Sequence, residues 1–128
     1  MYILLIIGIG GFFGAVLRYL ISGWVQNNII TFPVGTMAVN FIGCFILSLV
    51  MNLSEYEGFF TEKTRIFLTI GLLGAFTTMS TFSYESFQLL EDKEILLFGY
   101  NLVGTITLAF LGIYLGKIIV EYYGGVNI

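Results

Sequence analysis

Histidine is absent from this 128-residue chain, and cysteine occurs only once, at Cys44. Without histidine the chain cannot build a histidine-based zinc site, a Ser-His triad or an imidazole general base. With one cysteine it cannot form an internal disulfide. Charged residues are also scarce, because they make up 10% of the chain, whereas a soluble domain carries roughly 25%. The composition therefore predicts a membrane protein.

Long apolar runs occupy most of the chain, and 58% of its residues are hydrophobic. A helix needs about 20 apolar residues to cross a bilayer. We predict four such helices, near residues 3–23, 34–52, 66–89 and 95–118. The predicted fold class is an all-α membrane protein in which residues 1–128 form a single four-helix transmembrane domain. We expect it to be a multi-pass protein of the cell membrane.

Positive charges are distributed only slightly unevenly between the two sides of such a protein. With four spans, the side that holds both termini carries Lys63, Arg65 and Lys117, and the other carries Lys93 and, near the end of the first span, Arg18. The positive-inside rule then gives a weak orientation preference. This is compatible with dual-topology insertion and an antiparallel dimer, and equally with a single orientation. The sequence pI of about 4.6 does not suggest a nucleic-acid partner.

Small residues recur at helical spacing in the first and last spans. Gly10 and Gly14 lie four residues apart in the first span. In the fourth span one stripe contains Asn101, Thr105, Ala109, Gly112 and Gly116. Small residues at this spacing let helix backbones approach closely in a membrane, and polar residues there seek partners on other helices. We therefore expect close helix packing and a homo-oligomer.

The third predicted span carries many polar residues for a membrane helix. Fewer than three helical turns contain Thr77, Thr78, Ser80, Thr81, Ser83 and Glu85. An unsatisfied polar group in hydrocarbon costs several kcal/mol, so this cluster should face protein or water. Gly71 and Gly74 weaken the helix just before it. The segment from Gly74 to Thr78 is either a helix interruption whose carbonyls can bind a cation, or a continuous helix with a tight glycine contact.

Other polar side chains in the spans each have two interpretations. Arg18 either lines a water-filled vestibule and concentrates an anion there, or extends to the membrane surface. Asn40 either donates to an anion through its amide or bonds to a neighbouring helix, and Asn101 and Thr105 pose the same choice. Glu85 either couples transport to protons or lies at the membrane surface.

Three sequence blocks together resemble the Fluc (CrcB) family of fluoride channels. They are GGFFGAVLRY at residues 10–19, PVGTMAVNFIG at 33–43 and GLLGAFTTMSTFSYE at 71–85. The resemblance implies four-helix subunits, with a broken third helix, that assemble as antiparallel, dual-topology homodimers. It also implies two passive, fluoride-selective pores per dimer, which let cytoplasmic fluoride leave the cell and so relieve fluoride toxicity.

The resemblance also implies roles for individual residues. Backbone carbonyls of Gly74 and Thr77 from both subunits would hold a structural Na+ at the dimer centre. Arg18 and Glu85 would lie in the vestibules. The implied fluoride pore is lined by Asn40, Thr78, Met79, Ser80, Thr81, Phe82, Asn101 and Thr105. The hydroxyl and amide groups among them are donors that can replace the water around a dehydrated anion.

Met79 departs from the family's usual pattern, in which two phenylalanines three residues apart present their ring edges to the pore. An aromatic ring has a positive edge that can approach a small anion, whereas the thioether of Met79 lacks one. Met79 and Phe82 are also compatible with ordinary helix packing. We expect conduction to survive, because the rest of the implied lining is present.

Two other membrane functions compete with a channel. A small dual-topology multidrug carrier needs a carboxylate deep in the membrane, ideally in an early helix, and the first span holds Arg18 and no acid. A structural subunit without transport would leave the polar residues of the last three spans without a use. The sequence shows no nucleophile–base arrangement, so we do not expect an enzyme.

Overall fold

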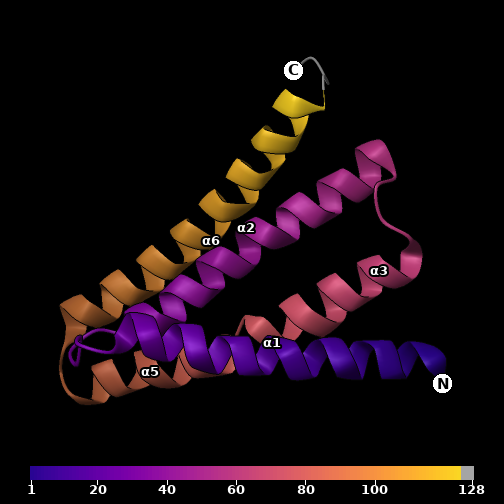
Figure 1. The fold of residues 1–128 in the computed structure, drawn as a ribbon. Coiled ribbons are helices and arrows are strands. Elements are labelled where there is room, and N and C mark those ends of the chain that lie inside the picture. Colours follow the sequence, from indigo (N-terminus) through magenta and orange to yellow (C-terminus); the bar gives the residue numbers. More distant parts are fainter. Residues whose placement is uncertain (125–128) are drawn as a thin grey trace.

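The computed structural model describes residues 1–124, and nearly all of them are helical (Figure 1). The elements are α1 (Tyr2–Gln26), α2 (Val34–Glu57), α3 (Glu62–Ile66), the π-helix η1 (Phe67–Leu73), α4 (Gly74–Phe76), α5 (Met79–Glu91) and α6 (Ile95–Tyr123). The helical stretches long and apolar enough to cross a membrane are Tyr2–Gln26, Val34–Tyr56, Glu62–Glu91 and Ile95–Tyr123. The structure therefore confirms an all-helical fold with four potential membrane spans.

The helices extend beyond the apolar ranges predicted from the sequence. α2 continues to Glu57 and ends at Gly58, whose φ of 59° is the left-handed conformation typical of a helix C-cap. Thr61 then caps α3, because its hydroxyl accepts a hydrogen bond from the Thr64 N–H at 3.3 Å. Hydropathy locates the part of a helix that lies in the bilayer, whereas capping residues decide where the helix ends.

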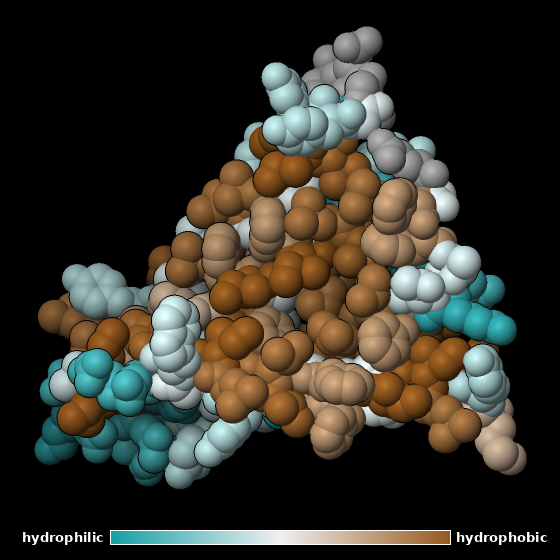
Figure 2. Space-filling view, viewed as in Figure 1, coloured by the Kyte–Doolittle hydropathy of each residue, from teal (hydrophilic) through white to brown (hydrophobic). Residues whose placement is uncertain are grey.

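The helices form two pairs that diverge across the molecule (Figure 1). α2 lies along α6, and α1 lies along the third span, mainly η1 and α4. Figure 2 shows a face that is hydrophobic over most of its area, with hydrophilic residues mainly at its corners. The buried apolar residues are Val39, Val50, Leu73, Phe76, Phe82, Leu89 and Val120. A chain with so small a core and such apolar faces is suited to a surrounding of lipid or of a second protein copy.

Glycines bring α1 close to the third span. A Cβ atom added to Gly10 would lie 3.1 Å from the Gly71 Cα and 2.8 Å from the Phe67 carbonyl oxygen. A Cβ atom added to Gly14 would lie only 2.1 Å from the Leu72 carbonyl oxygen. These distances confirm that the glycines of the first span allow a close approach of two backbones, and they identify η1 as the partner.

The small residues of α6 serve the contact with α2 in the same way. Gly112 and Gly116 are both buried. A Cβ atom added to Gly112 would lie 3.0 Å from the Phe41 carbonyl oxygen, and one added to Gly116 would lie 2.7 Å from the Ser48 Cβ. The part of the predicted stripe that contains Gly112 and Gly116 is therefore a packing face against α2.

We expect Gly14→Ala to destabilise the protein, because the new methyl group would collide with the Leu72 carbonyl and push α1 away from η1. Overpacking of this kind costs about 1–3 kcal/mol. Gly8→Ala is the matched control, since a Cβ atom at Gly8 meets nothing within 4 Å. Thermal unfolding of both variants in one detergent measures the difference. Equal midpoints for the two variants would contradict the close contact between α1 and η1.

Candidate functional site

The third span is interrupted at Thr77 and Thr78. α4 ends at Phe76, and both threonines have extended backbone conformations, with ψ angles of 157° and 121°. α5 begins at Met79, and the Thr78 hydroxyl caps it by accepting from the Thr81 N–H at 3.2 Å. A β-branched side chain suits extended backbone, and a threonine hydroxyl is better used at a helix start than in its interior. The local sequence therefore accounts for the separation of α4 from α5.

Asn40 of α2 satisfies the backbone of the interruption. Its amide nitrogen donates to the Thr78 carbonyl at 3.0 Å, and its amide oxygen accepts from the Thr78 N–H at 2.8 Å. The side chain thus exchanges two hydrogen bonds with one residue, as a paired strand residue does in a sheet. An amide nitrogen carries two hydrogens, so one N–H of Asn40 remains for another partner. Asn40 therefore forms an interhelical contact and also keeps one amide N–H that can donate to another group.

The interruption also frees a group of backbone carbonyls. In a continuous helix the Thr78 N–H would bond to the Gly74 carbonyl, but here it bonds to Asn40. Among residues 1–124, the carbonyl oxygens of residues 74–77 accept no hydrogen bond. Gly74 is exposed and Thr77 is half-buried. Unwound backbone carbonyls are ligands that membrane proteins use for Na+, so this group fits such an ion chemically.

Hydroxyl groups gather at the start of α5. The Thr78 hydroxyl lies 3.3 Å from that of Ser80 and donates to that of Thr81 at 3.1 Å. Thr78 is buried, whereas Ser80 and Thr81 are exposed. Together with Asn40, these residues place several donors around the interruption.

A cavity of about 230 Å³, here called the central cavity, lies between α2, the interruption and α6. The predicted pore residues that line it are Asn40, Thr78, Met79, Phe82 and Thr105. Phe82 is buried, while Met79 is 73% exposed. A mostly apolar cavity with a few convergent polar groups is typical of a site for a small ligand.

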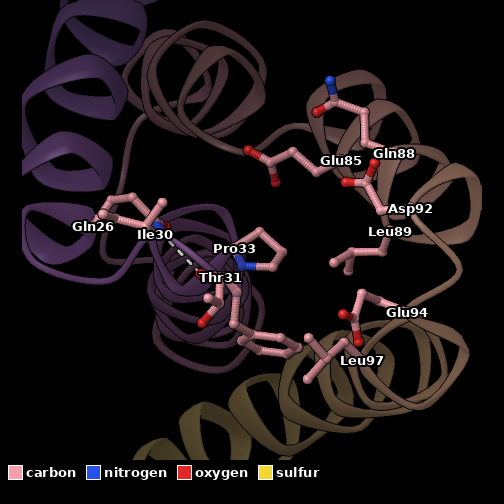
Figure 3. Close-up of a pocket in the computed structure, with 11 residues that line it drawn as sticks. Gln26, Ile30, Thr31, Pro33, Glu85, Gln88, Leu89, Asp92, Glu94 and Leu97 are labelled. Atoms are coloured by element: carbon pink, nitrogen blue, oxygen red, sulfur yellow. Dashed lines mark hydrogen bonds between the residues drawn. The ribbon is translucent and has the colours of Figure 1, made fainter.

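A second cavity, here called the outer cavity, has a volume of about 540 Å³ and lies where the α1–α2 loop meets the α5–α6 connection (Figure 3). Glu85, Asp92 and Glu94 line it. The Thr36 hydroxyl donates to Glu85 Oε1 at 2.9 Å. Within the described residues, Glu85 Oε2 is buried without a hydrogen-bond partner. Glu85 therefore joins the wall of this cavity to α2.

A single side chain holds the α1–α2 loop at the edge of the outer cavity. The Gln26 amide donates to the carbonyls of Ile29 and Phe32 and accepts from the Gly35 N–H at 2.8 Å. The Gly35 N–H belongs to the first turn of α2, where the helix itself offers it no acceptor. Gln26 thereby fixes the loop against the helix that carries Thr36 and Asn40.

A buried chain of hydrogen bonds joins α5 to α6. Thr105 Oγ1 donates to Asn101 Oδ1 at 3.3 Å, and Asn101 Nδ2 donates to Ser86 Oγ at 2.8 Å. The Ser86 hydroxyl then donates to the Phe82 carbonyl at 2.7 Å. Ser86 is 3% exposed and Asn101 is 1% exposed. Asn101 and Thr105 therefore bond to protein groups, and one N–H of the Asn101 amide takes no part in this series of hydrogen bonds.

Arg18 is not brought together with the other predicted residues. It is half-buried on α1, lines neither cavity, and forms no salt bridge within residues 1–124. Sequence reasoning in turn did not single out Gln26 or Ser86. The available signal for Ser86 was its position four residues after Phe82, on the same helix face.

The chain is similar to known membrane channels over most of its length. The profile of a family described as CrcB-like protein, Camphor Resistance (CrcB), matches residues 5–117. A Methanosarcina acetivorans protein named fluoride-specific ion channel FluC 1 is 62% identical over 118 residues, which are 92% of this chain and 90% of that protein. FluC 3 of Methanosarcina barkeri is 56% identical over 117 residues, or 91% and 89% of the two chains. FluC of Geotalea daltonii is 42% identical over 123 residues, or 95% and 99%.

We expect Asn40→Asp to lower the stability of the protein. A carboxylate cannot donate to the Thr78 carbonyl, and leaving a buried acceptor without its partner costs about 1–3 kcal/mol. Asn52→Asp is the control, because Asn52 donates to the Ser48 carbonyl within its own helix, at 2.7 Å. Thermal unfolding in detergent compares the two variants. An Asn40→Asp protein as stable as the control would show that the interruption does not depend on Asn40.

Proposed function

This chain belongs to the CrcB family of multi-pass membrane proteins, and from that premise we propose that it is a fluoride-selective passive channel. The observation that carries the proposal is 62% identity, over 92% of the chain, to a protein named as a fluoride-specific ion channel. The proposed role is to let cytoplasmic fluoride leave the cell and so to relieve fluoride toxicity. The relatives are named as channels rather than enzymes, which agrees with the expectation from the sequence.

The donors around the interruption and the central cavity are suited to an ion that has lost its water. Fluoride is small and strongly hydrated, so a pore has to offer hydrogen-bond donors in place of water without holding the ion too tightly. We propose that the unused N–H of Asn40 and the hydroxyls of Thr78, Ser80 and Thr81 fill this role. Among the described residues that line the central cavity, none carries a positive charge that would trap the anion.

Residues on α5 and α6 complete the proposed lining. Thr105 lines the central cavity, and its hydroxyl donates to Asn101, which lies one helical turn earlier in α6. Phe82 lines the same cavity with an aromatic ring, whose positive edge can approach the anion. Met79 occupies the position of a second ring and offers a polarizable thioether there.

We propose that two copies assemble as an antiparallel, dual-topology homodimer with two pores. The apolar faces and small core of the single subunit support a second copy as partner. The nearly balanced positive charges of the two sides are compatible with insertion in both orientations. Lipid would cover the remaining apolar surface.

We also propose a structural Na+ at the centre of this dimer. The carbonyl oxygens of Gly74 and Thr77, which lack hydrogen-bond donors within the described residues, would hold it. When bound, the ion would neutralise the partial negative charge of these oxygens and hold the interruption in place. Arg18 and Glu85 would lie in the vestibules, where Arg18 would raise the local concentration of the anion.

Ion efflux from liposomes tests the proposed function. Reconstituted wild-type protein should release fluoride rapidly and without proton coupling, and it should retain chloride, because the donors are matched to a small ion. Ion-selective electrodes measure both ions, and empty liposomes are the control. Slow, saturable transport that responds to a pH gradient would instead support a small dual-topology multidrug carrier. Absence of any transport would support a structural subunit.

Met79→Phe tests the departure from the family's pattern. We expect both the wild-type protein and the variant to conduct fluoride, with rates within about tenfold of each other, because one aromatic contact contributes only about 1 kcal/mol. Met51→Phe is a suitable control, since Met51 is an exposed α2 residue that lines neither cavity. A silent wild-type protein beside a conducting Met79→Phe variant would overturn this expectation.

A further inference from the structure

On α5, the buried polar residue Ser86 lies between residues that line the two cavities. Leu89 lines the outer cavity and Phe82 lines the central cavity. Ser86 lies between them at spacings of three and four residues, which places all three on one face of the helix. Ser86 is buried and lines neither cavity.

The facing helix, α6, repeats this arrangement. Leu97 lines the outer cavity and Thr105 lines the central cavity. Asn101 lies four residues from each of them, on the same helix face, and is almost completely buried. Its amide nitrogen donates to the hydroxyl of Ser86, so the two intermediate residues close the space between α5 and α6 by a direct hydrogen bond.

α2 also has a buried polar residue between residues that line the two cavities. Pro33 lines the outer cavity and Asn40 lines the central cavity, and Thr36 lies between them at spacings of three and four residues. Thr36 is buried and donates to Glu85 of α5. The hydrogen-bonded pair of Ser86 and Asn101 is here called the neck, and Thr36 is joined to α5 beside it through Glu85, the residue before Ser86.

We propose that the neck is the constriction that fluoride has to open between the two cavities, and that Ser86 is the positioning residue that keeps it closed. The inference rests on the proposed channel function and adds to it the location of the barrier. Fluoride would replace the Ser86 hydroxyl as the acceptor of the Asn101 N–H. The exchange breaks one hydrogen bond and forms another, and no covalent bond changes.

The direction of the buried hydrogen bonds supports this role. From Thr105 to Asn101, to Ser86 and on to the Phe82 carbonyl, each group donates to the next. The hydroxyl hydrogens of Thr105 and Ser86 are therefore both occupied in this state. A fluoride ion in the neck would accept the Asn101 N–H that now bonds to Ser86, so the number of hydrogen bonds to this donor would not change. The ion can therefore bind without being trapped.

Two substitutions of Ser86 with opposite expected effects test the proposal. Ser86→Ala removes the acceptor that holds Asn101 and should speed fluoride efflux about fivefold, the effect of one neutral hydrogen bond on a barrier. Ser86→Thr keeps the hydroxyl but adds a methyl group at a position that is only 3% exposed, and should slow efflux about fivefold. Fluoride efflux from liposomes with equal amounts of protein measures both.

Ser48→Ala is the matched control. Ser48 is a buried serine of α2 whose hydroxyl donates to the Ile113 carbonyl of α6 at 2.6 Å, and it lines neither cavity. It should conduct at the wild-type rate although it also loses an interhelical hydrogen bond. Elution volume and thermal midpoint of each variant, together with retention of an entrapped dye, separate an altered barrier from a damaged protein.

The outcomes are distinguishable. Faster efflux in Ser86→Ala with retained dye, slower efflux in Ser86→Thr and an unchanged control would support the neck as the barrier. Unchanged or slower efflux in Ser86→Ala, with a conducting wild-type protein, would overturn the inference and leave the channel function standing. If Ser86→Ala does not fold, Ser86→Thr decides, and an unchanged or faster rate would overturn the inference. A silent wild-type protein would overturn the channel function and the inference with it.

Discussion

A chain that leaves helical geometry inside a bilayer has to satisfy its backbone with protein groups, because lipid offers no hydrogen bonds. Asn40 meets that constraint by exchanging two hydrogen bonds with Thr78. The pair holds α2 against the interruption, lets Thr78 cap α5, and leaves the carbonyls of residues 74–77 without donors. The central cavity and the proposed ion sites all lie around this one contact.

Two kinds of helix contact divide the molecule. Glycine contacts join α1 to η1 and α6 to α2, and they depend on close backbone approach. Polar contacts join α2 to α5 and α5 to α6, and they lie between residues that line the two cavities. Glycine packing tolerates little movement, since a single added methyl group collides, whereas hydrogen bonds can be exchanged with a passing polar species. The rigid contacts thus form the frame, and the exchangeable ones lie along the proposed pathway.

The sequence predicted the four spans and the close packing of Gly10 and Gly14, because hydropathy and small-residue spacing are local signals that any membrane helix obeys. It also grouped most of the residues that line the central cavity, although on the resemblance rather than on spacing alone. It did not identify Ser86 as a partner of Asn101 or Thr36 as a partner of Glu85. Such pairs depend on how the helices are oriented toward each other in the folded protein, and the periodicity of one helix alone does not determine that orientation.

The π-helix η1 changes how the third span has to be counted. Its i→i+5 bonding accommodates more residues in each turn than the 3.6 of an α-helix. A helical wheel drawn through Glu62–Glu91 as one regular helix would therefore assign the wrong azimuth to every side chain that follows Leu73. In substitution scans of this span, the helical wheel is therefore best restarted after η1 and again at Met79, where α5 begins after the extended residues Thr77 and Thr78.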